Sequence, residues 1–169
     1  NHDLLTHIAG EVASLSAMIA TRVNDIETED CATISFVMSS GALASSSITL
    51  GAAGDETRIR FVFEHLTATS GSAPYAPGSQ PWTFTARDEN LQSKIDQAVA
   101  ATPFEAVGFQ GFFTEVALAI AGEPNNAVRL QDGAISIALV TAIYHSARTG
   151  QRVALQLRPD HELYKGWLP

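Results

Sequence analysis

The side chains in this sequence that could move protons near neutral pH are its five histidines. His2 stands beside Asp3 at the start of a segment with helical apolar spacing, so the pair could face a cleft together. His65 follows Glu64 at the end of a predicted strand, where a general base is conceivable, although no nucleophile stands beside it. The other three fall in predicted helices or in the C-terminal arm, where packing or surface roles are expected: His7, His145 and His161.

Two further features could bind a metal ion or react. The acidic run from Asp25 to Asp30, which includes Glu27 and Glu29, could bind a hard cation, but charges between two strands usually form a solvated turn. Cys31 has no second cysteine for a disulfide and no Cys/His cluster for zinc. We therefore expect no metal site in this chain.

The common signatures of nucleotide binding and of covalent catalysis are missing. Neither G-x-G-x-x-G nor G-x-x-x-x-G-K-[ST] occurs, and the glycine pairs Gly51/Gly54 and Gly108/Gly111 lie in the wrong context. A G-x-S-x-G elbow and an H-E-x-x-H pair are also absent. No nucleotide cradle is therefore encoded in these residues.

Length and charge restrict the class of protein. The 169 residues are 46% apolar, enough for one domain with a buried core, and 18 acidic against 10 basic residues give a net charge of −8. This acidic balance argues against a nucleic-acid partner. No apolar run is long enough to cross a bilayer, so we expect no membrane partner and a soluble, cytoplasmic protein; an exported one with a removed signal stays possible.

Apolar residues that alternate with polar ones predict the strands of an antiparallel sheet. The predicted strands are 12–23, 32–38, 42–50, 57–64, 81–86 and 152–157, with a hairpin turn at Ser39–Gly41 and an irregular loop over 67–80. On the first strand we expect Ala13, Leu15 and Ala17 to share one face.

Helical spacing and capping residues predict helices between these strands. A short helix ends at Gly10, and three more span 88–101, 109–122 and 131–149, before an irregular arm over 158–169. The resulting fold class is α+β, with an open-faced, predominantly antiparallel sheet and helices packed on one of its faces.

The opposite face of this sheet is small and weakly polar rather than charged. It carries Ser14, Ser16, Thr33, Ser35, Ser45, Ser47 and Thr49. One interpretation is a plain solvent-exposed surface. The other is a flat face that packs against its own copy in a two-fold dimer.

Segments at both ends of the chain resemble the Gfo/Idh/MocA oxidoreductases. At the C-terminal end these are Ala142–Leu155, with its Ser-Ala-Arg-Thr-Gly sequence, and Pro159–Trp167. At the N-terminal end, Asp3–Val12 and Ile26–Leu43 are similar to the family's first helix, long strand and hairpin. The resemblance spans essentially the whole chain.

The resemblance implies that residues 1–169 are the C-terminal domain of a two-domain enzyme that transfers hydride between NAD or NADP and a sugar, polyol or related carbonyl compound. Family members bind the dinucleotide in an N-terminal Rossmann domain, whereas the C-terminal domain forms the substrate pocket and the oligomer interface. Asp3 matches the last residue of the family's Asp-x-x-x-His-x-x-Asp-like segment, so the catalytic histidine would precede Asn1. We therefore expect no catalytic residue and no cofactor site in this chain. The expected partners are the Rossmann domain, a sugar-like substrate and a second copy of the chain.

Two classes of function stay open at this point. The first is the substrate-binding and oligomerising half of a nicotinamide-dependent oxidoreductase, and the second is a free-standing ligand-binding or scaffolding domain. The candidate substrate-binding residues are His2, Asp3, Arg22, His65 and Tyr164, although surface or packing roles are the alternative for Arg22, His65 and Tyr164.

Overall fold

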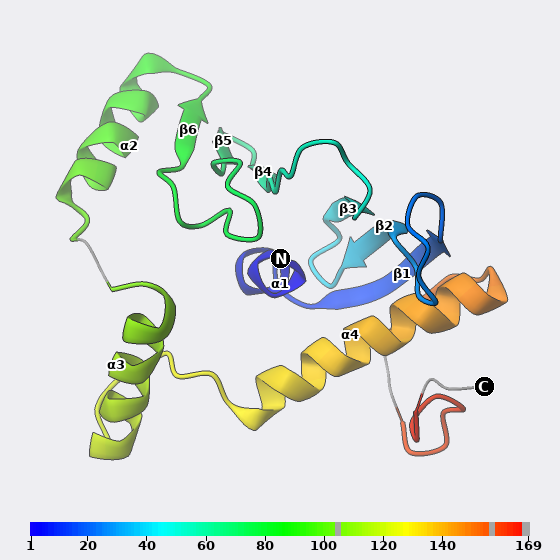
Figure 1. The fold of residues 1–169 in the computed structure, drawn as a ribbon. Helices are drawn as coiled ribbons and strands as arrows, with labels where there is room; N and C mark the ends of the chain where they lie inside the picture. The colour runs from blue at the N-terminus through cyan, green and yellow to red at the C-terminus, as the bar shows by residue number, and fades with distance from the viewer. Residues whose placement is uncertain (104–105, 156–157, 167–169) are drawn as a thin grey trace. The chain divides into compact units, whose positions relative to one another are not determined.

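The computed structural model describes residues 1–103, 106–155 and 158–166 and divides the chain into two compact units (Figure 1). Residues 2–53 together with 129–169 form the first, which we call the four-stranded unit. Residues 54–128, with Asn1, form the second, the three-stranded unit. Both contain helices and antiparallel sheet, which confirms the α+β class, but the strands divide between two sheets where we expected one.

The four-stranded unit is built on a sheet of order β3-β2-β1-β7, antiparallel throughout. Its strands are β1 (Val12–Ala20), β2 (Cys31–Met38), β3 (Leu43–Thr49) and β7 (Val153–Ala154), and its helices are α1 (His2–Ala9) and α4 (Leu130–Thr149). The β2–β3 hairpin turns at Gly41, whose φ of 89° is a conformation that glycine adopts readily, as predicted.

Helix α4 lies along one face of this sheet and encloses the core with it (Figure 1). The core side chains come from β1, β2 and α4: Val12, Leu15, Ala17, Ile34, Phe36, Met38, Leu139, Ala142 and Ile143. Leu5 and Ala9 of α1 pack against the same cluster. The opposite face is exposed at Ser16, Thr33, Ser35, Ser45, Ser47 and Thr49, in agreement with the predicted open face.

A β-bulge corrects the predicted orientation of the first strand. The pairing register with β2 shifts between Val12 and Ser14, so Ala13 is an extra residue on β1. Val12 and Leu15 consequently both face the core, 4% and 1% exposed, whereas Ala13 is exposed rather than inward. Strict alternation cannot anticipate this inserted residue.

The strand predicted to reach residue 23 ends at Ala20. The carboxylate of Asp30, which is 1% exposed, accepts hydrogen bonds from the backbone N–H groups of Arg22, Val23 and Asn24 at 2.7–2.8 Å. These bonds replace the sheet partners that the chain would need to continue as a strand. Asp30 therefore fixes the loop from β1 to β2.

The three-stranded unit contains a sheet of order β4-β5-β6 with β4 (Arg60–Val62), β5 (Leu66–Thr69) and β6 (Thr83–Ala86). The strand predicted over 57–64 is shorter and is observed as β4. The strand β5 begins one residue before the loop predicted over 67–80 and includes the first three residues of that loop. Phe61 lies opposite Ala68, which lies opposite Phe84, so these three side chains share one face.

Two helices follow β6, namely α2 (Glu89–Ala101) and α3 (Gly108–Ala121). Asp88 caps α2 as predicted, because its carboxylate accepts a hydrogen bond from the backbone N–H of Leu91. Gln92 then pairs with the free edge of β6, accepting from the N–H of Ala86 and donating to the carbonyl of Phe84. Helix α2 is thereby fixed to the sheet.

The predicted final strand over 152–157 is observed only as β7, and Gln156 and Leu157 lie outside the described residues. Residues 158–166 follow as a series of turns, with hydrogen bonds from His161 N–H to Arg158 and from Tyr164 N–H to His161. Among the residues that the structure describes, none of the helices is sufficiently long and apolar to span a membrane.

Candidate functional site

The predicted pair on α1 is held from two sides within the four-stranded unit. His2 Nε2 lies 3.2 Å from Ser46 Oγ on β3, and the His2 ring meets the Phe36 ring edge-on with centroids 5.5 Å apart. Asp3 accepts a hydrogen bond of 2.6 Å from Ser136 on α4. The two side chains thus fix the first turn of α1 to both the sheet and α4.

The environment of His2 disfavours its charged form. Burial lowers the pKa of His2, the positive amino terminus lowers it further, and the neighbouring Asp3 carboxylate opposes both effects. A neutral imidazole both donates and accepts a hydrogen bond, which suits a contact with a hydroxyl group such as that of Ser46.

The remaining predicted residues are exposed and lie in other segments. Arg22 is on the β1–β2 loop and Tyr164 is in the turns after β7, whereas His65 belongs to the three-stranded unit, in the turn between β4 and β5. Within the described part of the chain, Arg22 and Tyr164 have no recorded hydrogen bond or ion pair with His2 or Asp3. Within the four-stranded unit, the structure therefore brings His2 and Asp3 together and leaves Arg22 and Tyr164 in other segments.

His65 has an acidic neighbour but no enclosing site. Its Nε2 lies 3.7 Å from Glu64 Oε1, and both side chains are largely exposed. Its backbone carbonyl accepts the N–H of Arg87, and Arg87 also donates to the Glu64 carbonyl, so the local bonds serve the β4–β5 turn. This geometry is that of a surface turn.

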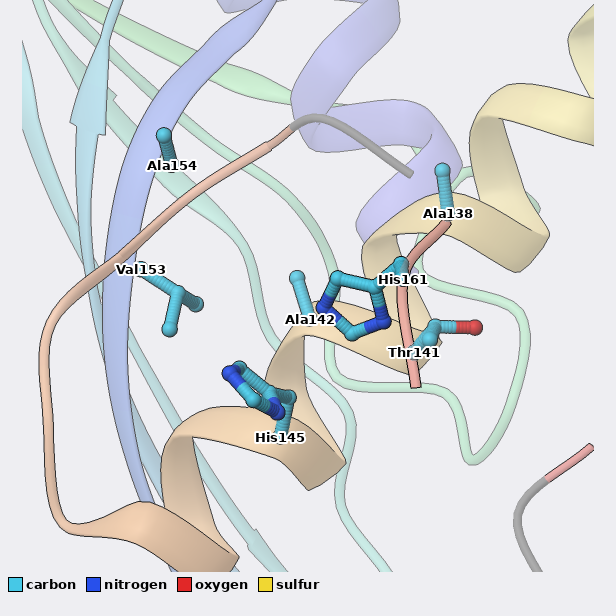
Figure 2. A pocket seen from close by; sticks show the side chains of 7 residues that line it. All are labelled: Ala138, Thr141, Ala142, His145, Val153, Ala154 and His161. Carbon is cyan, nitrogen blue, oxygen red and sulfur yellow. The ribbon is translucent and has the colours of Figure 1, made fainter. Parts of the chain in front are cut away.

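A small pocket lies between α4, β7 and the turns over 158–166 (Figure 2). Its lining is mostly apolar, with two histidine rings, one from α4 and one from the C-terminal turns: Ala138, Thr141, Ala142, His145, Val153, Ala154 and His161. The rings of His145 and His161 meet edge to face with centroids 4.7 Å apart. Sequence reasoning assigned these two histidines separately to helix and arm and did not pair them.

Two other side chains on α4 make contacts that the sequence did not predict. Ser146, 1% exposed, accepts from the N–H of Ala17 at 2.9 Å and donates to the carbonyl of Gln151 at 2.6 Å. Tyr144 donates to Glu29, and burial together with this carboxylate raises the pKa of Tyr144 to about 12. Ser146 was part of the recognised Ser-Ala-Arg-Thr-Gly segment, but nothing local indicated its partner on β1.

The described glycines with positive φ lie in several kinds of turn. Gly10, Gly122 and Gly150 end helices, Gly41 lies in the β2–β3 hairpin, Gly108 begins α3, and Gly166 lies in the turns after β7; none of these six lies in a turn that leads from a strand into a helix. At Gly111, an added Cβ would collide with the Ala106 carbonyl, so the space beside this glycine is filled by the chain's own backbone. Among residues 1–103, 106–155 and 158–166, no cluster of three His, Cys, Asp or Glu side chains could hold a metal ion.

Solved structures share this fold across most of the chain. The WlbA dehydrogenase from Chromobacterium violaceum, solved with NADH and UDP-GlcNAcA, is 29% identical, with 94% of this chain and 44% of that chain covered and a TM-score of 0.70. WlbA from Bordetella pertussis, with the same ligands, is 24% identical over 92% of this chain and 42% of that chain, with a TM-score of 0.69. Aldose-aldose oxidoreductase from Caulobacter crescentus is 18% identical over 90% and 44% of the two chains, with a TM-score of 0.68.

The chain spans less than half the length of each of these structures. No curated protein matches it. The family model described as GFO/IDH/MocA C-terminal domain matches residues 1–69, which hold α1, the hairpin and the strands up to β5. The match over residues 1–69 and the shared fold make this chain similar to the C-terminal domains of the Gfo/Idh/MocA oxidoreductases, in agreement with the resemblance at its two ends.

Proposed function

We propose that this chain is the substrate-binding and oligomerising half of an NAD(P)-dependent oxidoreductase that acts on a sugar, polyol or related carbonyl compound. The observation that carries the proposal is the fold shared over 94% of the chain with a 29% identical dehydrogenase solved with NADH and UDP-GlcNAcA. The chain covers 44% of that protein. We propose that another segment of the parent supplies the cofactor site.

The division of labour follows from the chemistry. In such a reaction the nicotinamide carries the hydride, while the protein holds the substrate and exchanges the accompanying proton. The proposed contribution of this chain is to bind and orient the substrate. We assign no catalytic residue to it.

Substrate contacts are proposed for Arg22, His65, Tyr164 and the His2–Asp3 pair. Hydroxyl-rich substrates need several fixed donors and acceptors, and these side chains provide both kinds. His2 and Asp3 are held by Ser46 and Ser136, which reduces the entropy lost on binding.

The open face of the four-stranded sheet is the proposed oligomer interface. Its exposed residues are serine and threonine together with Met18 and Leu43, which are 71% and 79% exposed. A flat surface of small, uncharged side chains allows close approach of a second sheet across a two-fold axis without bringing like charges together. We propose a homo-oligomer assembled through this face.

The test joins this chain to a cofactor-binding half and measures reduction of NAD and NADP with a panel of UDP-sugar acids, free sugars and polyols. We expect turnover with at least one of these substrates. Substitutions at Arg22 and Tyr164 should raise KM more than they lower kcat, because they remove binding rather than chemistry. No turnover, with ligand binding retained by the chain alone, would instead favour the free-standing ligand-binding or scaffolding domain.

A further inference from the structure

Tyr75, in the connection from β5 to β6, has a backbone conformation that is unusual for its residue type. Its φ is 61°, and within the described part of the chain it is the only residue other than glycine with a positive φ. The N–H of Ala76 donates to the carbonyl of Ala73, so Tyr75 is the third residue of a turn whose second residue is Pro74. A positive φ at this position is typical of a type II turn, where glycine or asparagine is the usual residue. A bulky tyrosine there strains the backbone.

Hydrogen bonds from other parts of the three-stranded unit hold this conformation in place. The Thr57 hydroxyl oxygen accepts the N–H of Tyr75 at 3.0 Å. The Gln80 side chain accepts the N–H of Ser72 at 3.0 Å and thereby closes the loop over 72–80. Strained backbone positions persist where such contacts fix them, and they are common at ligand-binding sites. Because the loop is already fixed, a ligand that binds to it loses little free energy in ordering the chain.

The aromatic ring of Tyr75 does not offset this strain by packing. The residue is 77% exposed, and its side chain makes no hydrogen bond and no ring contact with the residues that the structure describes. The other large rings of this unit, in contrast, stack on one another: Phe61 lies against Phe63 and against Trp82, with centroids 6.2 and 6.1 Å apart. A strained position thus presents an aromatic face outward, as a ligand contact requires.

The residues around Tyr75 in the sequence indicate the class of ligand. The segment from Leu66 to Ala86 contains no charged side chain and is rich in serine and threonine, so it offers hydroxyl groups but no counter-charge for a phosphate or an ammonium group. The face of an aromatic ring is the negative part of its quadrupole and attracts the slightly positive C–H groups of a sugar ring. We propose that Tyr75 binds a pyranose ring of the substrate on its aromatic face, an inference that rests on the proposed function.

Three variants at this position separate the ring from the strain. Tyr75→Phe keeps both, and Tyr75→Leu keeps a bulky side chain and the strain but removes the aromatic face. Tyr75→Asn removes the ring and suits a positive φ. Melting temperatures measure the strain without any ligand: the asparagine variant should melt about 2 °C or more above the wild-type chain, because the strain is relieved, and the other two should melt close to it.

Calorimetric titration of the same chains with UDP-GlcNAcA and with glucose measures the contribution of the ring to binding. The wild-type chain and Tyr75→Phe should bind alike, whereas Tyr75→Leu and Tyr75→Asn should bind about threefold to tenfold more weakly. Titration with UDP, which carries no sugar ring, should give the same result for all four chains. Lys94→Asn, at an exposed position of α2, is the matched control and should bind as the wild type does.

Equal affinities of all four chains for UDP-GlcNAcA and for glucose would overturn this inference and leave the proposed function intact. The inference would also fail if Tyr75→Asn melted at or below the wild-type temperature, or if loss of the ring weakened the binding of UDP alone to the same extent, because the ring would then bind the nucleotide. A wild-type chain that binds neither UDP-GlcNAcA nor glucose would contradict both the inference and the substrate-binding role on which it rests.

Discussion

Single polar side chains hold distant segments of the four-stranded unit together. Ser146 links α4 to β1 and to the turn after the helix, and Asp30 closes the β1–β2 loop. The sequence indicated Ser146 only as part of a familiar segment and Asp30 only as one of several acids. The Ala17 partner of Ser146 lies 129 residues away and depends on the tertiary fold, so local pattern could not indicate it. The partners of Asp30 lie only six to eight residues away, but their contact depends on the conformation of the β1–β2 loop, which strand alternation does not predict.

Replacement of Ser146 by alanine should destabilise the protein. The change leaves the buried N–H of Ala17 and the carbonyl of Gln151 without their partner, at a cost of about 1–3 kcal/mol in the free energy of unfolding. Urea denaturation measures the difference. Ser45→Ala on the exposed face is the control and should change stability by less than about 0.5 kcal/mol; equal effects would show that the Ser146 bonds contribute little.

Asp30→Ala should destabilise the protein in a pH-dependent way. Hydrogen bonds from Asn24, Val23 and Arg22 hold the pKa of Asp30 well below its usual range, against the opposing effect of burial. Because the folded-state pKa is depressed, the stabilisation is complete above the ordinary aspartate pKa of about 4 and is lost progressively as the pH falls further.

Denaturation of the Asp30→Ala and wild-type chains between neutral and strongly acidic pH tests this expectation. The stability gap should be largest at neutral pH and shrink in acid, while Asp25→Ala, at an exposed position of the same loop, should show little gap at any pH. A gap that stays constant with pH would contradict the role of the ionised carboxylate.

At the scale of elements, periodicity predicted the helices better than the strands. The helix ends at Gly10, Gly122 and Gly150 and the Asp88 cap were all identified, because glycine and capping residues act locally. The bulge at Ala13 and the strand β5 were missed, since one depends on pairing with β2 and the other is a short Leu-Thr-Ala-Thr segment without strong alternation.

Two glycines of α4 should respond to alanine in opposite directions. Gly150 ends the helix with a φ of 68°, where alanine costs about 1–2 kcal/mol. Gly133 lies within the helix, and an added Cβ there meets nothing within 4 Å, so alanine should stabilise by up to about 1 kcal/mol. Melting temperatures of the two variants provide the comparison, and a shift of the same sign in both would refute this account of the helix end.

For the molecule as a whole, strand alternation predicted the α+β class correctly, and the resemblance carried by the motifs at both ends agrees with the family-model match over residues 1–69. The contacts of the candidate site were harder to predict from the sequence. His2 and Asp3 are brought together because they are neighbours on one helix, but their contacts with Ser46 and Ser136 come from residues 44 and 133 positions away. Contacts between residues so far apart in the chain cannot be predicted from the residue pattern of a single sequence.

The proposed oligomer predicts that the open sheet face controls association. Ser35→Arg, near the middle of that face, should weaken self-association by about tenfold or more, roughly 1.4 kcal/mol, because a two-fold axis repeats the added charge. Sedimentation equilibrium measures the change. Thr85→Arg on the three-stranded sheet is the matched control and should associate as the wild type does; a wild-type chain that is strictly monomeric at high concentration would contradict the interface.

The most direct test of the proposed division of labour is a calorimetric titration of this chain with NADH and NADPH. Because the proposed function assigns the dinucleotide to another segment of the parent, we predict no saturable binding of either molecule. Saturable binding with a micromolar dissociation constant would contradict it and place the cofactor site within these residues.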